Sequence, residues 1–252
     1  MIPVILPFAI LIVLFAALFG LALVTFAGSN SLLESIKARF SLSHEESHIF
    51  SEVELPSITP VFNKDMPRIE GYVLPQALFY HRGHTWVAPH ESGTAVVGID
   101  EFLSKLIGTP SIAARPREGQ LVKQGEQGWT VCRGGKYLDI VSPLEGEVVA
   151  VNNRLTENPE MLSNDPYGDG WLMIIRPRSF SRDLRNLLHG SAAGRWMEEA
   201  ALKLRTFFSG NTGLVFQDGG LPLDGLADHL EPEDWHRLMT CIFGSKPKTS
   251  DA

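Results

Sequence analysis

Lys136 follows two glycines in the segment TVCRGGKYLDIVSP, and its amine is the group in this sequence with the clearest capacity for chemistry. The segment reads as two short strands joined by a tight turn. A lysine held at the tip of such a hairpin is the means by which carrier domains present a swinging cofactor. A solvated lysine on an ordinary turn would give the same pattern, so both interpretations stay open.

A second pattern, H-E-x-x-H, is formed by His44, Glu45 and His48. On a helix the two histidines would share one face and bind zinc, with Glu45 as a general base. The motif lies in a short polar segment that lacks the apolar flanks of a buried helix, and no third ligand follows it. We therefore interpret it as the start of a solvated helix, capped by Ser43 and Glu46, and expect no metal site.

The composition and the spacing of residues exclude several classes of function. The 252-residue chain has a net charge of −7, and a nucleic-acid partner is not expected because phosphate binding needs a basic face. Cys132 and Cys241 lie far apart without metal-ligand spacing, which favours a reducing compartment. On the hairpin, Cys132 is expected to be a small buried hydrophobe rather than a reactive thiol. The sequence shows no Ser-His-Asp spacing, no paired carboxylates and no phosphate loop, so we expect that the protein is not an enzyme.

Residues 2–28 contain no charged side chain, and the run is long enough to cross a bilayer as a helix. A signal peptide cleaved near Ala27 is the alternative. It is disfavoured because no Lys or Arg precedes the run and because the run exceeds the usual length of a signal-peptide core. Residues 1–28 are therefore predicted to be a single transmembrane helix. Lys37 and Arg39 follow the span, so the positive-inside rule places the bulk of the chain in the cytoplasm.

Short strands would have to position the candidate lysine. Residues 29–71 are predicted to be a juxtamembrane connector, since proline and glycine interrupt its last part. Beyond it, strand-like segments alternate with turns rich in Gly, Pro, Asn and Asp, which is typical of a compact β barrel or sandwich. These segments are 80–88, 93–99, 120–122, 129–132, 138–141, 146–151 and 171–176. A helix is predicted at 100–107, ended by Gly108 and Pro110.

Helices are predicted after the strands. Segments 182–189 and 191–208 have the apolar spacing of helices. Farther on, a short helix is predicted near 223–229, and Pro232 suits the first turn of another. Because apolar stripes mostly form core, we expect these last helices to pack on the barrel or on the preceding helix, rather than to form a face for a partner. The apolar face of the last helix would carry Trp235, Leu238, Met239 and Ile242.

Three motifs resemble those of the glycine cleavage system H protein family. They are H-T-W-V at 84–87, S-P-L-E-G-E-V at 142–148 and N-D-P-Y-G-D-G-W-L at 164–172, in the family's order and spacing. The similarity extends over about residues 73–208. It implies a mainly β fold with flanking α-helices, a lipoyl/biotinyl-type barrel-sandwich, over residues 72–208. A helical extension with a disordered tail would follow over 209–252.

The resemblance also implies a lipoyl group on the lysine of the hairpin, which in the family reads roughly E-S-V-K-A-x-S-D-I-Y-S-P. Without gaps, this pattern places the family's glutamate at Cys132 and its lysine at Gly135, so Lys136 falls one position late. A shift of one residue turns a side chain toward the other face of a strand. Glycines at 134 and 135 could permit a rearranged turn that re-aims Lys136. We expect the hairpin 132–138 to project from the barrel.

Two hypotheses follow. In the first, the protein is a membrane-anchored, non-catalytic scaffold or adaptor that has lost the lipoyl lysine and binds no cofactor. In the second, it is a working carrier with lipoate on Lys136. Protein partners are expected in both, and the misplaced lysine favours the first. The resemblance places His84 near the cleft that receives the loaded arm; without the lysine, we expect instead a hydrogen-bonded strand histidine beside Trp86.

Overall fold

The computed structural model describes residues 66–90, 92–211 and 224–244. The predicted transmembrane helix at 1–28, most of the predicted connector and the predicted tail lie outside these ranges, as do His44, Glu45 and His48. Within the ranges described, no helix is both long enough and apolar enough to cross a membrane.

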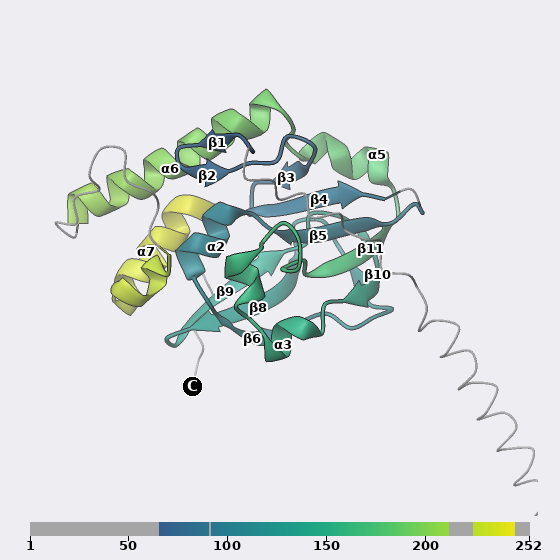
Figure 1. Ribbon diagram of the computed structural model, residues 1–252, viewed down its shortest axis with the longest axis horizontal. Coiled ribbons are helices and arrows are strands. Elements are labelled where there is room, and N and C mark those ends of the chain that lie inside the picture. The colour runs from purple at the N-terminus through teal and green to yellow at the C-terminus, as the bar shows by residue number, and fades with distance from the viewer. Residues whose placement is uncertain (1–65, 91, 212–223, 245–252) are drawn as a thin grey trace, which may run out of the picture. The chain divides into compact units, whose positions relative to one another are not determined.

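The described strands form a six-stranded sheet, a three-stranded sheet and a two-stranded ribbon (Figure 1). The large sheet has the order β3 (Phe79–His81), β4 (Thr85–Pro89), β5 (Ala95–Ile99), β11 (Met173–Pro177), β10 (Gly146–Val151) and β7 (Leu121–Val122). The small sheet has the order β6 (Ser111–Ala114), β8 (Gln127–Arg133) and β9 (Lys136–Val141). The ribbon pairs β1 (Arg68–Ile69) with β2 (Tyr72–Val73). These pairings are antiparallel, and the mainly β class predicted from the sequence is confirmed.

A single hydrophobic core joins the large and small sheets. On the small sheet, Val131 lies opposite Leu138 and Trp129 lies opposite Ile140, and all four side chains are buried. They belong to the same buried cluster as residues of the large sheet, among them Val97, Val148 and Ile175. Side chains alternate between the faces of a strand, so burial of these four fixes which face of the β8–β9 hairpin turns outward.

The helix α2 (Glu101–Ile107) forms where the sequence predicts a helix. Asp100 is its N-cap, with a carboxylate oxygen that accepts a hydrogen bond of 2.9 Å from the backbone N–H of Leu103. Gly108 ends the helix with a φ of 70°, in the left-handed region that glycine adopts most readily. The other described helices of the barrel region are α3 (Arg154–Glu157), α4 (Met161–Asn164), α5 (Phe180–Asp183), η2 (Leu184–Asn186) and α6 (Ser191–Asn211).

Two elements follow α6 in the described part of the chain. The short 3-10 helix η3 (Leu226–His229) contacts α2, and α7 (Pro232–Phe243) contacts α6 (Figure 1). Pro232 occupies the first turn of α7, as predicted. The expectation that the apolar stripe packs back on the molecule is confirmed, because Trp235, Leu238 and Met239 are buried.

The predicted strand 80–88 is wrong in one respect, because a turn at Arg82–His84 divides it into β3 and β4. His84 has a φ of 59°, outside the strand region, and the reversal lets Tyr80 pair with Trp86. The strand β6 was not predicted, since its sequence SIAA gives little alternation; it is held by pairing with β8.

The helix predicted at 182–189 begins earlier and ends earlier, as α5 and η2. It ends because Leu188 exchanges two backbone hydrogen bonds with Tyr80, of 2.7 and 2.8 Å, and this bridge needs extended backbone. The strand β1 lies within the segment predicted to be connector, where it pairs with β2.

Tyr167, in the N-D-P-Y-G-D-G-W-L motif, joins this loop to α2 and β2. Its hydroxyl donates to the carbonyl of Val73 (2.7 Å) and accepts from the backbone N–H of Glu101 (3.0 Å). The ring is fully buried, and burial raises the pKa of the phenol well above its usual value, so the hydroxyl keeps its proton and its donor role.

Replacing Tyr167 with phenylalanine should lower the free energy of unfolding by about 2 kcal/mol, because two buried backbone groups lose their partner. The melting temperature should fall by roughly 6 °C for a chain of this size. Tyr137→Phe is the matched control, since this tyrosine is 43% exposed, and it should leave the melting temperature unchanged. Equal melting temperatures for Tyr167→Phe and the wild type would contradict the assigned role of the hydroxyl.

Candidate functional site

The hairpin between β8 and β9 turns through two residues, Gly134 and Gly135. Arg133 and Lys136 pair across the last rung of the ladder, and the glycines between them have φ values of 54° and 77°. Positive φ at both central positions is the requirement of a type I′ hairpin turn, and glycine meets it without strain. The tip of the hairpin therefore carries no side chain.

Lys136 is the first residue of β9 and does not occupy the turn. Directly opposed residues of an antiparallel pair point to the same face, so Lys136 shares a face with Arg133 and, two residues on, with buried Leu138. Tyr137 points to the other face and is exposed. A Cβ built on Gly134 would lie 3.9 Å from the Lys136 amine, so the side chain lies back along the turn.

Arg133 attaches the hairpin to η3, the first element of the C-terminal extension. Its guanidinium binds both carboxylate oxygens of Asp228, with an Nε–Oδ1 distance of 2.7 Å, and a third nitrogen donates to the carbonyl of Thr109. Two-point pairing of this kind is the strong geometry for arginine and carboxylate. The turn residues Gly134 and Gly135 are exposed, and η3 contacts the hairpin at Arg133, in the last pair before the turn.

Asp228 also offsets a charge conflict at the hairpin. Arg133 and Lys136 are like charges directly opposite each other, an arrangement that destabilises a strand pair. The hydrogen bond from Arg133 lowers the pKa of Asp228, and the field of Lys136 lowers it further. The carboxylate is thus charged at neutral pH and faces both cations.

His84 lies in a closed aromatic pocket. Its Nδ1 is 2.7 Å from a carboxylate oxygen of Asp100, the residue that caps α2. The ring stacks on Phe102 at a centroid distance of 4.4 Å, and Trp196 of α6 and Phe243 of α7 lie 4.6 and 5.6 Å away. His84 is 1% exposed, so this pocket gives its imidazole no path to solvent.

The predicted hydrogen bond of His84 is therefore present, although the residue belongs to the turn before β4 and its aromatic neighbours differ from the one expected. Trp86 points elsewhere, with its indole N–H bonded to the carbonyls of Ile99 and Pro166.

Cys132 is half-buried rather than buried, on the same face as Tyr137.

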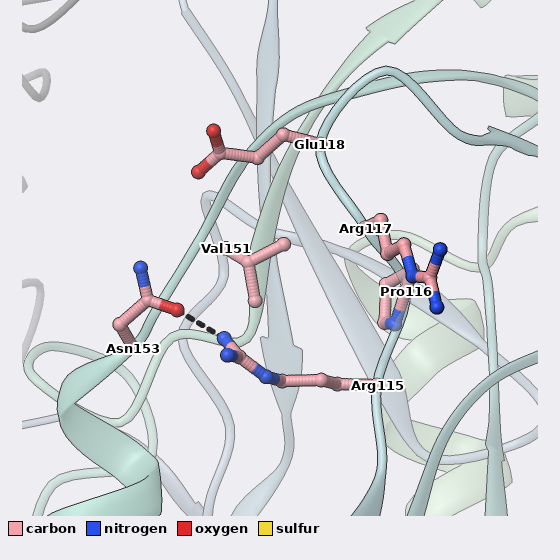
Figure 2. Close-up of a pocket in the computed structure, with 6 residues that line it drawn as sticks. All are labelled: Arg115, Pro116, Arg117, Glu118, Val151 and Asn153. Carbon is pink, nitrogen blue, oxygen red and sulfur yellow. Dashed lines mark hydrogen bonds between the residues drawn. The ribbon is translucent and has the colours of Figure 1, made fainter.

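A surface hollow of about 400 Å³ lies between the β6–β7 connection and the end of β10. No sequence pattern predicted it. It is lined by Arg115, Pro116, Arg117, Glu118, Val151 and Asn153. Figure 2 shows Arg115 reaching to the Asn153 side-chain oxygen, while the Glu118 carboxylate and the Arg117 guanidinium point in different directions. The polar groups do not converge on one point, so the hollow has no evident chemistry.

Comparison with known proteins gives a consistent result. The family described as glycine cleavage H-protein matches residues 78–200. The glycine cleavage system H protein of Hydrogenovibrio crunogenus is 40% identical over 109 residues, which are 43% of this chain and 84% of that protein. The H protein of Thermus thermophilus is 34% identical over 128 residues, 51% of this chain and 98% of that protein. A solved H-protein structure from Mycobacterium marinum is 28% identical, covers 48% of this chain and 98% of its own, and has a TM-score of 0.43.

The family match contains the hairpin and His84 but ends before the extension. Its last residue, 200, lies within α6, whereas η3 and α7 follow α6 in the chain. Asp228 and Phe243, which contact the hairpin and the His84 pocket, thus belong to a part of this chain that the family does not cover.

Proposed function

The chain belongs to the glycine cleavage H-protein family, and from this premise we propose that it is a non-catalytic scaffold or adaptor that carries no lipoyl group. In this proposal the barrel supplies a surface for protein partners and does not shuttle a reaction intermediate. The observation that carries the proposal is the position of the hairpin lysine.

A lipoyl group needs a lysine amine that stands free at the turn. Here the turn consists of Gly134 and Gly135, and Gly135 is the position that the family pattern gives to lysine. Lys136 is the first residue of β9, on the strand face that carries Arg133. The residues present at this tip therefore do not fit the cofactor that the family implies.

The second hypothesis, a carrier with lipoate on Lys136, is favoured by one observation. The amine lies beside the turn, 3.9 Å from a Cβ built on Gly134, so a small rearrangement of two glycines would bring it to the apex. That rearrangement would break the pairing of Arg133 with Lys136. This cost makes the carrier the second choice.

The mass of the protein separates the two hypotheses. We expect the chain purified from its native host to have an intact mass without a lipoyl adduct, and peptide mapping to find Lys136 unmodified. The purified wild-type chain, incubated with a lipoate-attaching ligase, lipoate and ATP, should remain unmodified. An H protein that bears the family lysine, treated in parallel, should be lipoylated. A lipoyl adduct on wild-type Lys136 would refute the scaffold and establish the carrier.

We also propose that the scaffold is tethered to a membrane by residues 1–28, with the barrel on the cytoplasmic side. The absence of charge in residues 2–28 and the basic residues Lys37 and Arg39 beyond them support this placement. A fixed anchor suits a protein that gathers partners at a surface, because a shuttle benefits from free diffusion between enzymes.

A further inference from the structure

The C-terminal segment 224–244 contacts the hairpin at one end and the His84 pocket at the other. We propose that this segment, which we call the clamp, holds the β8–β9 hairpin against α2 through the Arg133–Asp228 pair, and that this polar contact opens while the buried part of the segment stays in place. The clamp itself follows from the contacts of the chain.

The clamp approaches α2 through backbone. The N–H of Gly225 donates to the carbonyl of Lys105 (2.7 Å), and the Lys105 amine lies 3.1 Å from a carboxylate oxygen of Asp224. A Cβ built on Gly108 would lie 2.9 Å from the Cα of Gly225. Only a glycine at 108 permits this approach, so the end of α2 is shaped to receive η3.

Arg133 joins three segments at this place. It binds Asp228 of η3 and the carbonyl of Thr109, beyond the end of α2, while its backbone belongs to β8 of the hairpin. Removing Asp228 would leave Arg133 opposite Lys136 without the carboxylate that offsets the two charges. The hairpin is therefore stabilised by the clamp, and not only held beside it.

The two ends of the clamp differ in strength. At the α7 end, Trp235, Leu238 and Met239 are buried, and the ring of Phe243 lies edge-on to His84. At the hairpin end, Leu226 and Ala227 of η3 are also buried, but the contact with the hairpin is made by the Arg133 and Asp228 side chains, which are 27% and 39% exposed. Partly exposed ion pairs are weak and screened by salt, whereas buried apolar contacts are not. The contact between η3 and the hairpin should therefore open first, while α7 and the buried residues of η3 stay in place.

Hydrogen exchange of the full chain in detergent micelles, followed by mass spectrometry, tests the clamp. Asp228→Asn removes the charge with little change of shape and should speed exchange in peptides covering 130–138 and 224–230 by about fivefold. Asp234→Asn is the matched control, because Asp234 pairs with Arg237 inside α7 and should leave both peptides unchanged. High salt should speed the same two peptides in the wild type and have little further effect on Asp228→Asn.

Arg133→Gln should also speed exchange in both peptides, and adding Asp228→Asn to it should have little further effect, because the pair with Asp228 is already broken. Unchanged protection of 130–138 in Asp228→Asn and Arg133→Gln would overturn the clamp. Faster exchange that extends through β10 and β11 would also overturn it, since the Arg133–Asp228 pair would then stabilise the whole barrel and not the hairpin alone. A lipoyl adduct on Lys136 with this exchange pattern would refute the scaffold function and leave the clamp intact.

Discussion

Deleting residues 1–28 should transfer the protein from the membrane fraction to the soluble fraction. Residues 2–28 carry no charge, and as a helix they would be roughly 40 Å long, which exceeds the roughly 30 Å hydrocarbon core of a bilayer. Insertion of such a helix is effectively irreversible, so the full chain should stay with membranes through carbonate and high-salt washes. Fractionation and immunoblotting of both forms measures the effect, which we expect to be nearly complete.

A chain that lacks residues 246–252 is the control for deletion as such, and it should remain with the membranes. A soluble form that begins near Gly28 in normal cells would contradict the anchor and establish a cleaved signal peptide. Protease digestion of intact cells tests the orientation. Loss of the C-terminal residues to external protease would contradict the cytoplasmic placement, which rests on Lys37 and Arg39 alone.

Elements with a local cause could be predicted from the sequence. The helix α2 begins at its cap Asp100 and ends at Gly108, and both signals lie within the segment they delimit. The strand β10 coincides with the predicted segment 146–151 because alternation and flanking turns define it. The strands β1 and β6 have no such signal, since they are strands only through their partners.

In the candidate site, too, features that depend on neighbouring residues could be predicted, and contacts between distant segments could not. The hypothesis that Gly135 stands where the family has lysine needs only the alignment of one hairpin, because it concerns neighbouring residues. The attachment of Arg133 to Asp228 could not, since 95 positions separate them and neither residue belongs to a motif. The same holds for Phe243 beside His84. Contacts between distant segments depend on the packing of the whole chain, which local patterns do not describe.

The proposed loss of lipoylation has two possible causes at the hairpin. One is register, since the turn has glycine where the amine should stand. The other is access, since Asp228 of η3 binds Arg133 beside the turn. Each obstacle can be removed without the other, so their contributions can be measured separately.

Restoring the lysine position should produce lipoylation where the wild type has none. The repaired hairpin combines Gly135→Lys, Lys136→Ala and Cys132→Glu. A Cβ at 135 would meet nothing within 4 Å, so the only cost is backbone strain at a φ of 77°, about 1 kcal/mol. Loss of the Lys136 charge opposite Arg133 partly offsets that cost. Intact mass after co-expression with a lipoate-attaching ligase measures the fraction modified.

Asp228→Asn, added to the repaired hairpin, should raise the rate of modification further, by about the fivefold factor expected for opening of the clamp. Asp234→Asn in the same background is the control and should leave the rate unchanged, because its ion pair lies within α7. Asp228→Asn alone should remain unmodified, since access is of no use without an amine at the turn. Modification of Asp228→Asn at Lys136 would show that access, and not register, prevents lipoylation of the natural chain, and it would restore the carrier hypothesis.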